Sequence, residues 1–194
     1  MINQQDRLYE FVFKGLLADE ALDRAGRQSK NLTGYLDVEV ARVLSVELLD
    51  EQLVLSAKRM AAIYTAIAAF ENSVRKLILT LLLEEVGESW WEKCVSERIR
   101  KKAETRRREE EKIRWHTQRG QDLLNYTELG DLANIIRNNW DRFEPYIRSA
   151  EWATSLFDVI ERSRNVIMHS GTLDMRDIER IGINIRDWIK QVGS

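Results

Sequence analysis

Helix-breaking residues are scarce in this chain, and their scarcity limits its fold more than any other feature. The sequence has 194 residues but only one proline, Pro145, and nine glycines. Few positions therefore force a helix to stop, and the turn clusters that separate β-strands are rare. Hydrophobic residues make up 44% of the chain and charged residues 32%, the balance of a globular protein with a core. The sequence predicts an all-α fold.

The longest periodic pattern begins at Asp50 and should end near Gly87. Its apolar residues recur at spacings of three and four, the period of one helix face; they are Met60, Tyr64, Ile67, Val74, Ile78 and Leu81. Glu71, Arg75 and Lys76 lie near the middle of this stretch, where charges would be costly in a bilayer. We therefore expect a buried helix of a bundle and not a membrane span.

Three more helices are predicted downstream. The segment 97–114 interleaves nine Lys/Arg with five Glu, so its helix should be largely exposed. An amphipathic helix covers 129–143, with Thr127 able to cap its start. The next helix should end at Gly171; its inward face is formed by Leu156, Ile160, Ser163 and Ile167.

A last helix follows, with Thr172 as its expected cap. Its inward residues are Ile178, Ile181, Ile185, Trp188 and Val192. Together these patterns predict an antiparallel bundle of four to five helices over residues 53–194. Residues 1–52 form an N-terminal helical extension, in which the segment 26–34 should separate two helical pieces.

Charge and cysteine content narrow the classes of function. The formal net charge is only −2, so attraction to nucleic acid or anionic membrane must be local. Cys94 is the single cysteine and cannot form an internal disulfide, which favours a reducing cytoplasm, and the N-terminus does not read as a secretory signal. The two histidines have no cysteine cluster beside them. We expect no metal, no cofactor and no membrane partner.

The segment Glu161–Gly171, ERSRNVIMHSG, gathers the residues best suited to chemistry. On a helix that turns by 100° per residue, one stripe opposite the apolar face holds Asp158, Arg162, Asn165 and His169. Asn165 precedes His169 by one turn and could orient its imidazole, while Arg164 lies to the side and must reach with its long guanidinium arm.

Arg164-Asn165, followed by three residues and His169, resembles the Arg-Asn-x-x-x-His motif of HEPN ribonucleases. The surrounding segments ENSVRKLIL, GDLANIIRNNW and ERSRNVIMHSGTL are similar to the HEPN domain of the nuclear mRNA-surveillance endonucleases and their prokaryotic relatives. The similarity extends from about Leu53 to Val192. It implies a helical bundle with the motif placed before the final helix.

The resemblance also implies a homodimer in which two motif helices meet and build one composite site. Histidine suits proton transfer at neutral pH, and the fork of arginine donors suits a charged phosphate. His169 is then the acid or base, Arg164 the electrostatic stabiliser and Asn165 their neighbour in a metal-independent endoribonuclease.

The setting would be toxin–antitoxin function, phage defence or RNA quality control, with transfer or messenger RNA as substrate and a neutralising protein as partner. The chief alternative is a noncatalytic HEPN module that binds RNA or a nucleotide, or mediates protein interaction.

Secondary site candidates come from the long helix and from the motif stripe. Glu71 falls on the apolar stripe of its helix, so Arg75 one turn later is expected to pair with it. Asn72 beside Glu71, and Arg162 beside the motif, complete this secondary set. Glu71 and Arg75 equally fit a plain buried ion pair. Arg164 and His169 likewise have a structural alternative, in which Arg164 pairs with Glu161 and His169 interacts with the helix dipole.

The basic helix and the aromatic pair Trp90-Trp91 are possible RNA contacts. Arg98, Arg100, Lys101 and Lys102 are the candidate RNA-binding residues. The interspersed glutamates equally fit a solvated helix face. Trp90 and Trp91 could stack on bases, although packing against the bundle is the commoner role of such residues. His116 is expected at the surface.

Overall fold

A computed structural model of the protein describes residues 32–193. The chain divides between Val54 and Leu55 into two units. In the first, α2 (Leu32–Val43) is followed by a short 3-10 helix, η1 (Val46–Leu48). Gly34 was expected to belong to a break between helices but lies within α2. The other expected helical piece falls outside the described residues.

The second unit contains the bundle. The first helix of the bundle begins at Glu51, a few residues before the boundary between the units. Its elements are α3 (Glu51–Val86), α4 (Trp90–Cys94), α5 (Glu97–Glu111), η2 (Leu123–Tyr126), α6 (Leu129–Asn138), α7 (Trp140–Phe143), α8 (Ala150–Met168) and α9 (Met175–Val192). The described residues contain no β-strand. The all-α prediction is confirmed.

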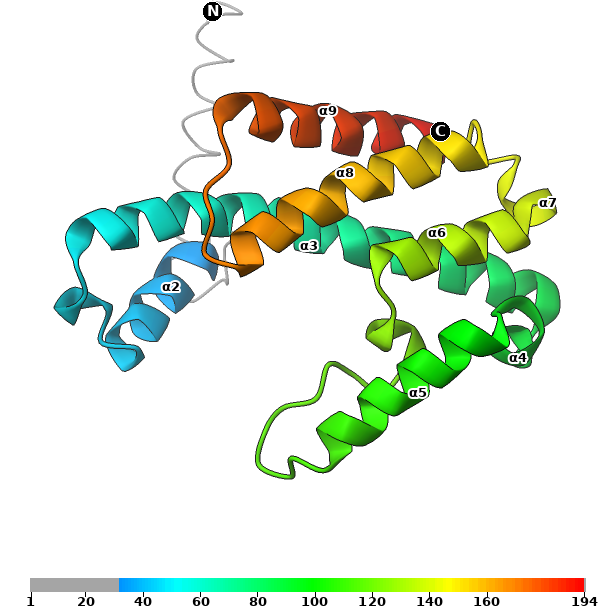
Figure 1. Ribbon diagram of the computed structural model, residues 1–194, viewed down its shortest axis with the longest axis horizontal. Coiled ribbons are helices and arrows are strands. Elements are labelled where there is room, and N and C mark those ends of the chain that lie inside the picture. Colours follow the sequence, from blue (N-terminus) through cyan, green and yellow to red (C-terminus); the bar gives the residue numbers. More distant parts are fainter. Residues whose placement is uncertain (1–31, 194) are drawn as a thin grey trace, which may run out of the picture. The chain divides into compact units, whose positions relative to one another are not determined.

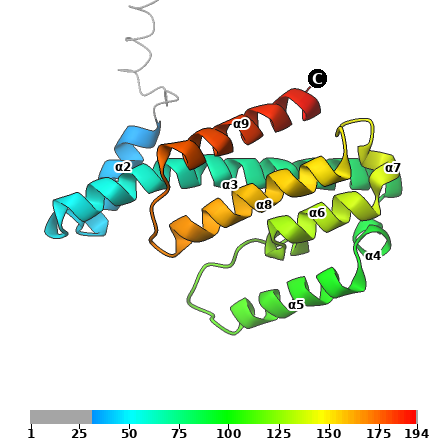
Figure 2. The ribbon, with the colours of Figure 1, turned by 45° about the horizontal axis from the view of Figure 1, so that its top comes forward.

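Helix α8 is central to the arrangement of the bundle. It packs against both α6 and α9, and α5 packs against η2. Figures 1 and 2 show that α8 runs in the opposite direction to α6 and α9, with α3 extending along the bundle behind it. The antiparallel bundle expected from the sequence is therefore present, and it places the end of α8 beside the middle of α3.

Aromatic side chains join α3, α8 and α9 in the core. The ring centroids of Phe70 and Phe157 lie 5.8 Å apart, as do those of Phe70 and Trp188, and those of Phe157 and Trp188 lie 5.2 Å apart. All three side chains are buried. Because burying one large apolar side chain contributes about 1.5–3 kcal/mol, this cluster is a substantial part of what holds α3 and α8 in register.

Helix α3 is, among the described residues, the one helix long and apolar enough to cross a membrane. In this fold its apolar face packs into the bundle, where Ile67, Val74, Ile78 and Leu82 are fully buried. Trp90 and Trp91 on α4 are also buried, with their rings in an edge-to-face contact. They pack in the core and are not available to stack on RNA.

Four helix boundaries differ from those expected. Helix α5 ends at Glu111 and not at Arg114. The pattern over 129–143 is interrupted at Asn139, which leaves α6 and α7 as separate helices. Thr127 does not cap α6, because its hydroxyl donates to the carbonyl of Leu124; Glu128 is the cap residue. The last helix is capped by Asp174, not Thr172, since the Asp174 carboxylate accepts from the backbone of Asp177. Periodicity locates a helix face well, but a cap depends on backbone angles that it does not reveal.

The end of α8 is closed by a compact turn. His169 is the residue that follows the last helical one, and Ser170 takes the left-handed conformation with φ 60°. The backbone N–H of Gly171 then donates to the carbonyl of Val166 over 2.8 Å. A Cβ at position 171 would lie 2.7 Å from Val166 Cγ1. Glycine is thus required by this close approach, and the positive φ falls one residue earlier.

Candidate active site

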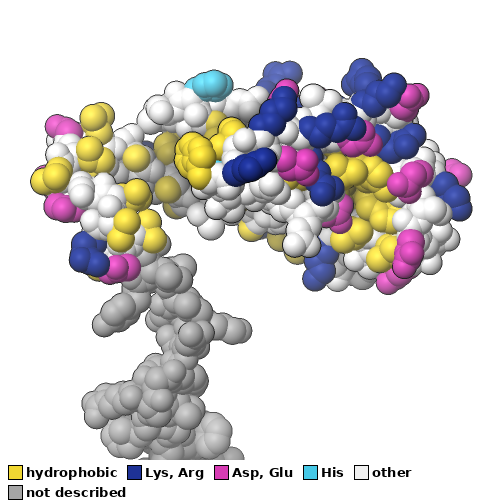
Figure 3. All heavy atoms as spheres, turned by 90° about the horizontal axis from the view of Figure 1, so that it is seen from below, with side chains coloured by type: hydrophobic (Ala, Val, Ile, Leu, Met, Phe, Trp, Pro, Cys, Tyr) yellow, Lys and Arg dark blue, Asp and Glu magenta, His cyan; other side chains and the backbone are white. Residues whose placement is uncertain are grey.

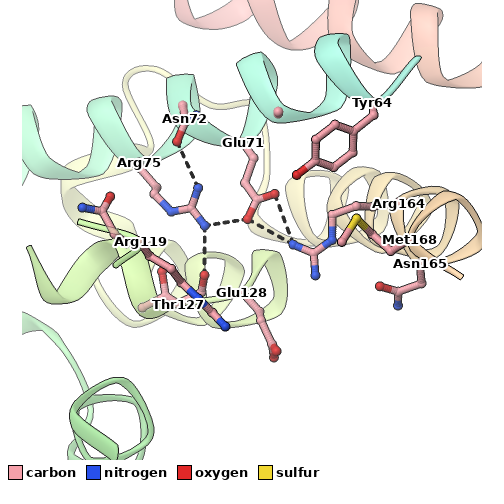
Figure 4. A pocket seen from close by; sticks show the side chains of 12 residues that line it. Tyr64, Glu71, Asn72, Arg75, Arg119, Thr127, Glu128, Arg164, Asn165 and Met168 are labelled. Atoms are coloured by element: carbon pink, nitrogen blue, oxygen red, sulfur yellow. Dashed lines mark hydrogen bonds and ion pairs between the residues drawn. The ribbon is translucent and has the colours of Figure 1, made fainter. Parts of the chain in front are cut away.

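A polar pocket of about 550 Å³ lies where α3, α8 and the segment before α6 come together. Figure 4 shows arginine and glutamate side chains from these elements converging on it. Its walls are formed by Tyr64, Ala68, Glu71, Asn72, Arg75, Arg119, Asn125, Thr127, Glu128, Arg164, Asn165 and Met168. The pocket therefore contains one of the two residues to which the motif assigns chemistry, Arg164.

Glu71 and Arg75 form the floor of the pocket. The Glu71 side chain is 8% exposed, and its Oε1 lies 2.5 Å from Nη2 of Arg75. Arg75 also donates to the carbonyls of Thr127 and Leu124 and to Oδ1 of Asn72. The expected pairing of Glu71 with Arg75 is present. Every nitrogen of the Arg75 guanidinium has a partner, so this arginine mainly ties α3 to the chain between η2 and α6.

Arg164 reaches into the same pocket from α8. Its Nη1 lies 3.3 Å from both carboxylate oxygens of Glu71, and its side chain is 23% exposed. Its Nε is buried but has no hydrogen-bond partner. The alternative in which Arg164 pairs at the surface with Glu161 is wrong, because its ion pair is with Glu71. Arg164 thus has guanidinium donors available to a ligand.

Glu161 lies one turn before Asn165 on α8 and interacts electrostatically with Arg164. Burial raises the pKa of the Glu161 carboxyl, and the neighbouring acids Glu128, Asp158 and Glu71 act in the same direction. Arg164 opposes this effect but does not outweigh it. The surroundings of Arg164 are therefore rich in carboxylates.

Asn165 and His169 occupy different surroundings. Asn165 is exposed and lines the pocket, whereas His169 is exposed at the end of α8 and is not one of the lining residues. Between the two, the described contacts include only the helical hydrogen bond from His169 N to Asn165 O, 3.1 Å long. The expected orientation of the imidazole by Asn165 is not seen within this chain. The bundle brings Arg164 and Asn165 together at the pocket and leaves His169 outside it.

A model of the Swt1-like HEPN domain family matches residues 65–193 of the chain, a range that includes the motif and every pocket-lining residue except Tyr64. The chain belongs to the Swt1-like HEPN family. Searches of curated proteins and of solved structures found no match. Membership in this family indicates a ribonuclease or an RNA-binding module.

The four cations expected from the sequence to bind RNA lie on α5, and they differ in whether a carboxylate neutralises them. Arg98 is exposed, and Arg100 donates to the carbonyl of Val95. Lys101 pairs with Glu97 over 2.6 Å, and Lys102 pairs with Glu128 and Asp131. On the face drawn in Figure 3, basic and acidic side chains are interspersed. Most of the positive charge of α5 is thus neutralised locally.

Glu128 links α5 to the start of α6 at the edge of the pocket. Its carboxylate pairs with Lys102 over 2.7 Å and also with Arg106. Burial alone would raise the pKa of Glu128, but Lys102 and Arg106 outweigh it, so its pKa lies below the ordinary value. For Lys102, burial lowers the pKa, and the two acidic partners raise it by more. The network stabilises one wall of the pocket.

Several pocket residues were not singled out from the sequence. Arg119 lies on an irregular segment, Asn125 in the short 3-10 helix η2 and Glu128 at the cap of α6. Helix periodicity carries no signal at such positions. Tyr64 was assigned to the core face of α3 but is half-exposed at the pocket.

Arg162 is exposed and makes no ion pair among residues 32–193. In that same range no group of three His, Cys, Asp or Glu side chains could hold a metal ion.

Proposed function

We propose that this HEPN domain is a metal-independent endoribonuclease that acts as a homodimer. The observation that carries the proposal is the state of Arg164, which enters a polar pocket with a buried Nε that has no partner. Its remaining contacts, two at 3.3 Å to one carboxylate, are long for charge-assisted hydrogen bonds. A phosphate in the pocket would accept from Nη2 of Arg164, for which the described residues provide no partner.

The proposed reaction uses the ribose 2′-OH as nucleophile. A His169 imidazole takes the 2′-OH proton while the 2′ oxygen forms a bond to phosphorus. The bond from phosphorus to the 5′ oxygen breaks, and that oxygen receives a proton from a second, protonated His169. Arg164 stabilises the negative charge that builds on the phosphoryl oxygens, which is the task for which a fixed guanidinium is well suited. The products are a 2′,3′-cyclic phosphate and a 5′-hydroxyl.

Two features of the end of α8 support a dimer. His169 is exposed beyond the pocket of its own chain, so it needs a second copy to meet a bound phosphate. Apolar side chains next to it are also solvent-exposed, namely Val166, Met168 and, across the pocket, Tyr64. Burying such residues against their symmetry mates would favour a two-fold interface. Light scattering tests this directly, and a strictly monomeric protein at micromolar concentration, with or without RNA, argues against the composite site.

The biological setting of the proposal is toxin–antitoxin function, phage defence or RNA quality control in the cytoplasm, with a regulatory protein as partner. Some HEPN toxins are silenced by nucleotide transfer to a tyrosine two residues after the histidine. Gly171 occupies that position here. The close contact of Gly171 with Val166 leaves no room for a side chain in this turn. Control of this chain would therefore use another route.

Purified protein incubated with total or transfer RNA in EDTA tests the activity. Cleavage should continue, leave a 2′,3′-cyclic phosphate or 3′-phosphate, and fail when the nucleotide at the cut site is 2′-deoxy. Products ending in a 3′-hydroxyl, or loss of cleavage in EDTA, would indicate metal-assisted hydrolysis instead. RNA binding without any cleavage would favour the noncatalytic HEPN module.

A further inference from the structure

The irregular segment between α5 and η2 differs in charge from the helix before it. Residues 112–120, which we call the 112–120 loop, read KIRWHTQRG. They contain the cations Lys112, Arg114 and Arg119 and no acidic residue. Lys112 and Arg114 are exposed and make no ion pair with a described residue. By contrast, Lys101, Lys102, Arg106, Arg107 and Arg108 on α5 are all paired with carboxylates. Unneutralised positive charge is thus found in the loop.

Trp115 lies in the middle of this loop and is 86% exposed. Its ring makes one contact, an edge-to-face pairing with His116 at 5.7 Å between centroids. Trp90, Trp91 and Trp188 are buried in the bundle. Leaving the largest apolar side chain in water, next to the unpaired cations Lys112 and Arg114, gains nothing for folding. An exposed aromatic flanked by positive charge is the arrangement by which proteins stack on unpaired bases.

The loop is also anchored so that its far end faces the pocket. Nε of Arg119 lies 2.6 Å from a carboxylate oxygen of Glu110, and the backbone N–H of Arg119 donates to the other oxygen. The hydroxyl of Tyr126, a buried residue, donates to the carbonyl of Gly120. Arg119 lines the pocket that holds Arg164, and its terminal nitrogens have no described partner (Figure 4). The same loop therefore reaches from the pocket to Trp115.

We infer that the 112–120 loop binds single-stranded RNA and guides it into the pocket. Arg119 contacts a backbone phosphate next to the one held by Arg164, Lys112 and Arg114 contact further phosphates, and Trp115 stacks on an unpaired base. The inference rests on the proposed RNA substrate and adds its form: the strand must be unpaired, because a base within a duplex does not offer its face to a side chain. It also assigns the RNA contact to the loop, whereas the sequence alone had indicated residues of α5.

Binding is measured by fluorescence anisotropy with a labelled, fully 2′-O-methylated oligonucleotide, which lacks the 2′-OH nucleophile and stays intact. Trp115→Ala should weaken binding of the single strand about fivefold to hundredfold, the range for losing one stacked base, and Trp115→Phe should keep most of the affinity. Arg114→Ala should reduce the slope of log affinity against log salt by about 0.7, one phosphate contact on a single strand. Arg107→Ala, whose cation is already paired with Glu111 on α5, is the matched control and should change neither value.

Each outcome bears on the loop separately from the proposed cleavage. Equal binding by Trp115→Ala and the unsubstituted protein, no binding of the oligonucleotide at all, or an equal loss of affinity for a 2′-O-methyl duplex would overturn the inference. Trp115-dependent binding without cleavage of unmodified RNA would leave the inference standing and remove the proposed activity. Circular dichroism spectra of the variants should match that of the unsubstituted protein, since Trp115 contributes little to the core.

Discussion

Arg164 on α8 and Glu71 on α3 are 93 residues apart in sequence, yet Nη1 of Arg164 lies 3.3 Å from each carboxylate oxygen of Glu71. Glu71 is already paired with Arg75 over 2.5 Å, so a single buried carboxylate is shared by two guanidinium groups. The shorter contact belongs to the arginine whose nitrogens are all satisfied. Glu71 therefore holds Arg164 at the pocket without saturating its donors, as the proposed binding of a phosphate requires.

Replacing Arg164 should abolish most cleavage without unfolding the domain. Arg164→Ala is expected to lower the cleavage rate by about 100- to 10,000-fold, the range for losing an electrostatic stabiliser, because no other pocket arginine on α8 can take its place. Glu71 keeps Arg75 as its partner, so circular dichroism should show an unchanged helix content. Single-turnover cleavage of a defined RNA measures the rate.

Arg162→Ala is the control for Arg164. Arg162 lies on the same helix, carries the same charge and is exposed outside the pocket. Its loss should change the cleavage rate less than about threefold, consistent with a surface substitution. A folded Arg164→Ala protein that cuts RNA at the original rate would contradict the assignment of Arg164.

His169 is expected to act across a dimer interface. His169→Ala should also lower cleavage by about 100- to 10,000-fold, the range for losing an acid or base, and its exposed position predicts little loss of stability. Mixing Arg164→Ala with His169→Ala protein produces heterodimers that keep one intact Arg164 and one intact His169 on opposite chains. Partial recovery of activity in the mixture is expected. No recovery, in mixtures whose subunits demonstrably exchange, would show that each residue acts within its own chain.

Removing the charge of Glu71 should destabilise the domain. Glu71→Gln leaves the guanidinium groups of Arg75 and Arg164 without their shared carboxylate in a largely buried site, and we expect the free energy of unfolding to fall by about 3 kcal/mol. Urea unfolding followed by circular dichroism measures it. Glu97→Gln, which removes an exposed ion pair with Lys101, serves as the control and should cost about 0.5 kcal/mol or less. Equal effects of the two substitutions would show that Glu71 has no special role.

The contribution of Glu128 to stability should depend on pH. Its pKa is lowered in the folded protein by Lys102 and Arg106, so folding favours its charged form. The stabilisation is present above the pKa of the unfolded chain and is lost as the pH falls through the lowered pKa of the fold. Glu128→Gln should cost about 1 kcal/mol at neutral pH, allowing for the partial exposure of the side chain. The difference from the unsubstituted protein should shrink in acid, as thermal unfolding at several pH values would show.

Local patterns along the sequence were enough to predict much of the fold. The three- and four-residue spacing of apolar side chains located α3, α6, α8 and α9, and a run of interleaved charges without glycine or proline located α5. The scarcity of proline and glycine argued against strands, and the described residues contain none. The pairing of Glu71 with Arg75 was also predictable, because residues four apart on a helix are neighbours by geometry. The motif residues Arg164, Asn165 and His169 were identified by the resemblance of their spacing and of the surrounding segments to the HEPN domain.

What the sequence alone could not determine are the contacts between segments distant along the chain. The pairing of Arg164 with Glu71 depends on how α8 packs against α3, and that packing is decided by the complementary shapes of Phe70, Phe157 and Trp188. The position of Arg119 at the pocket depends on Glu110 and Tyr126, which tie an irregular loop in place without any periodic signal. Helix formation follows from short-range spacing and local backbone preference, whereas a site follows from side chains that only tertiary packing brings within hydrogen-bonding distance.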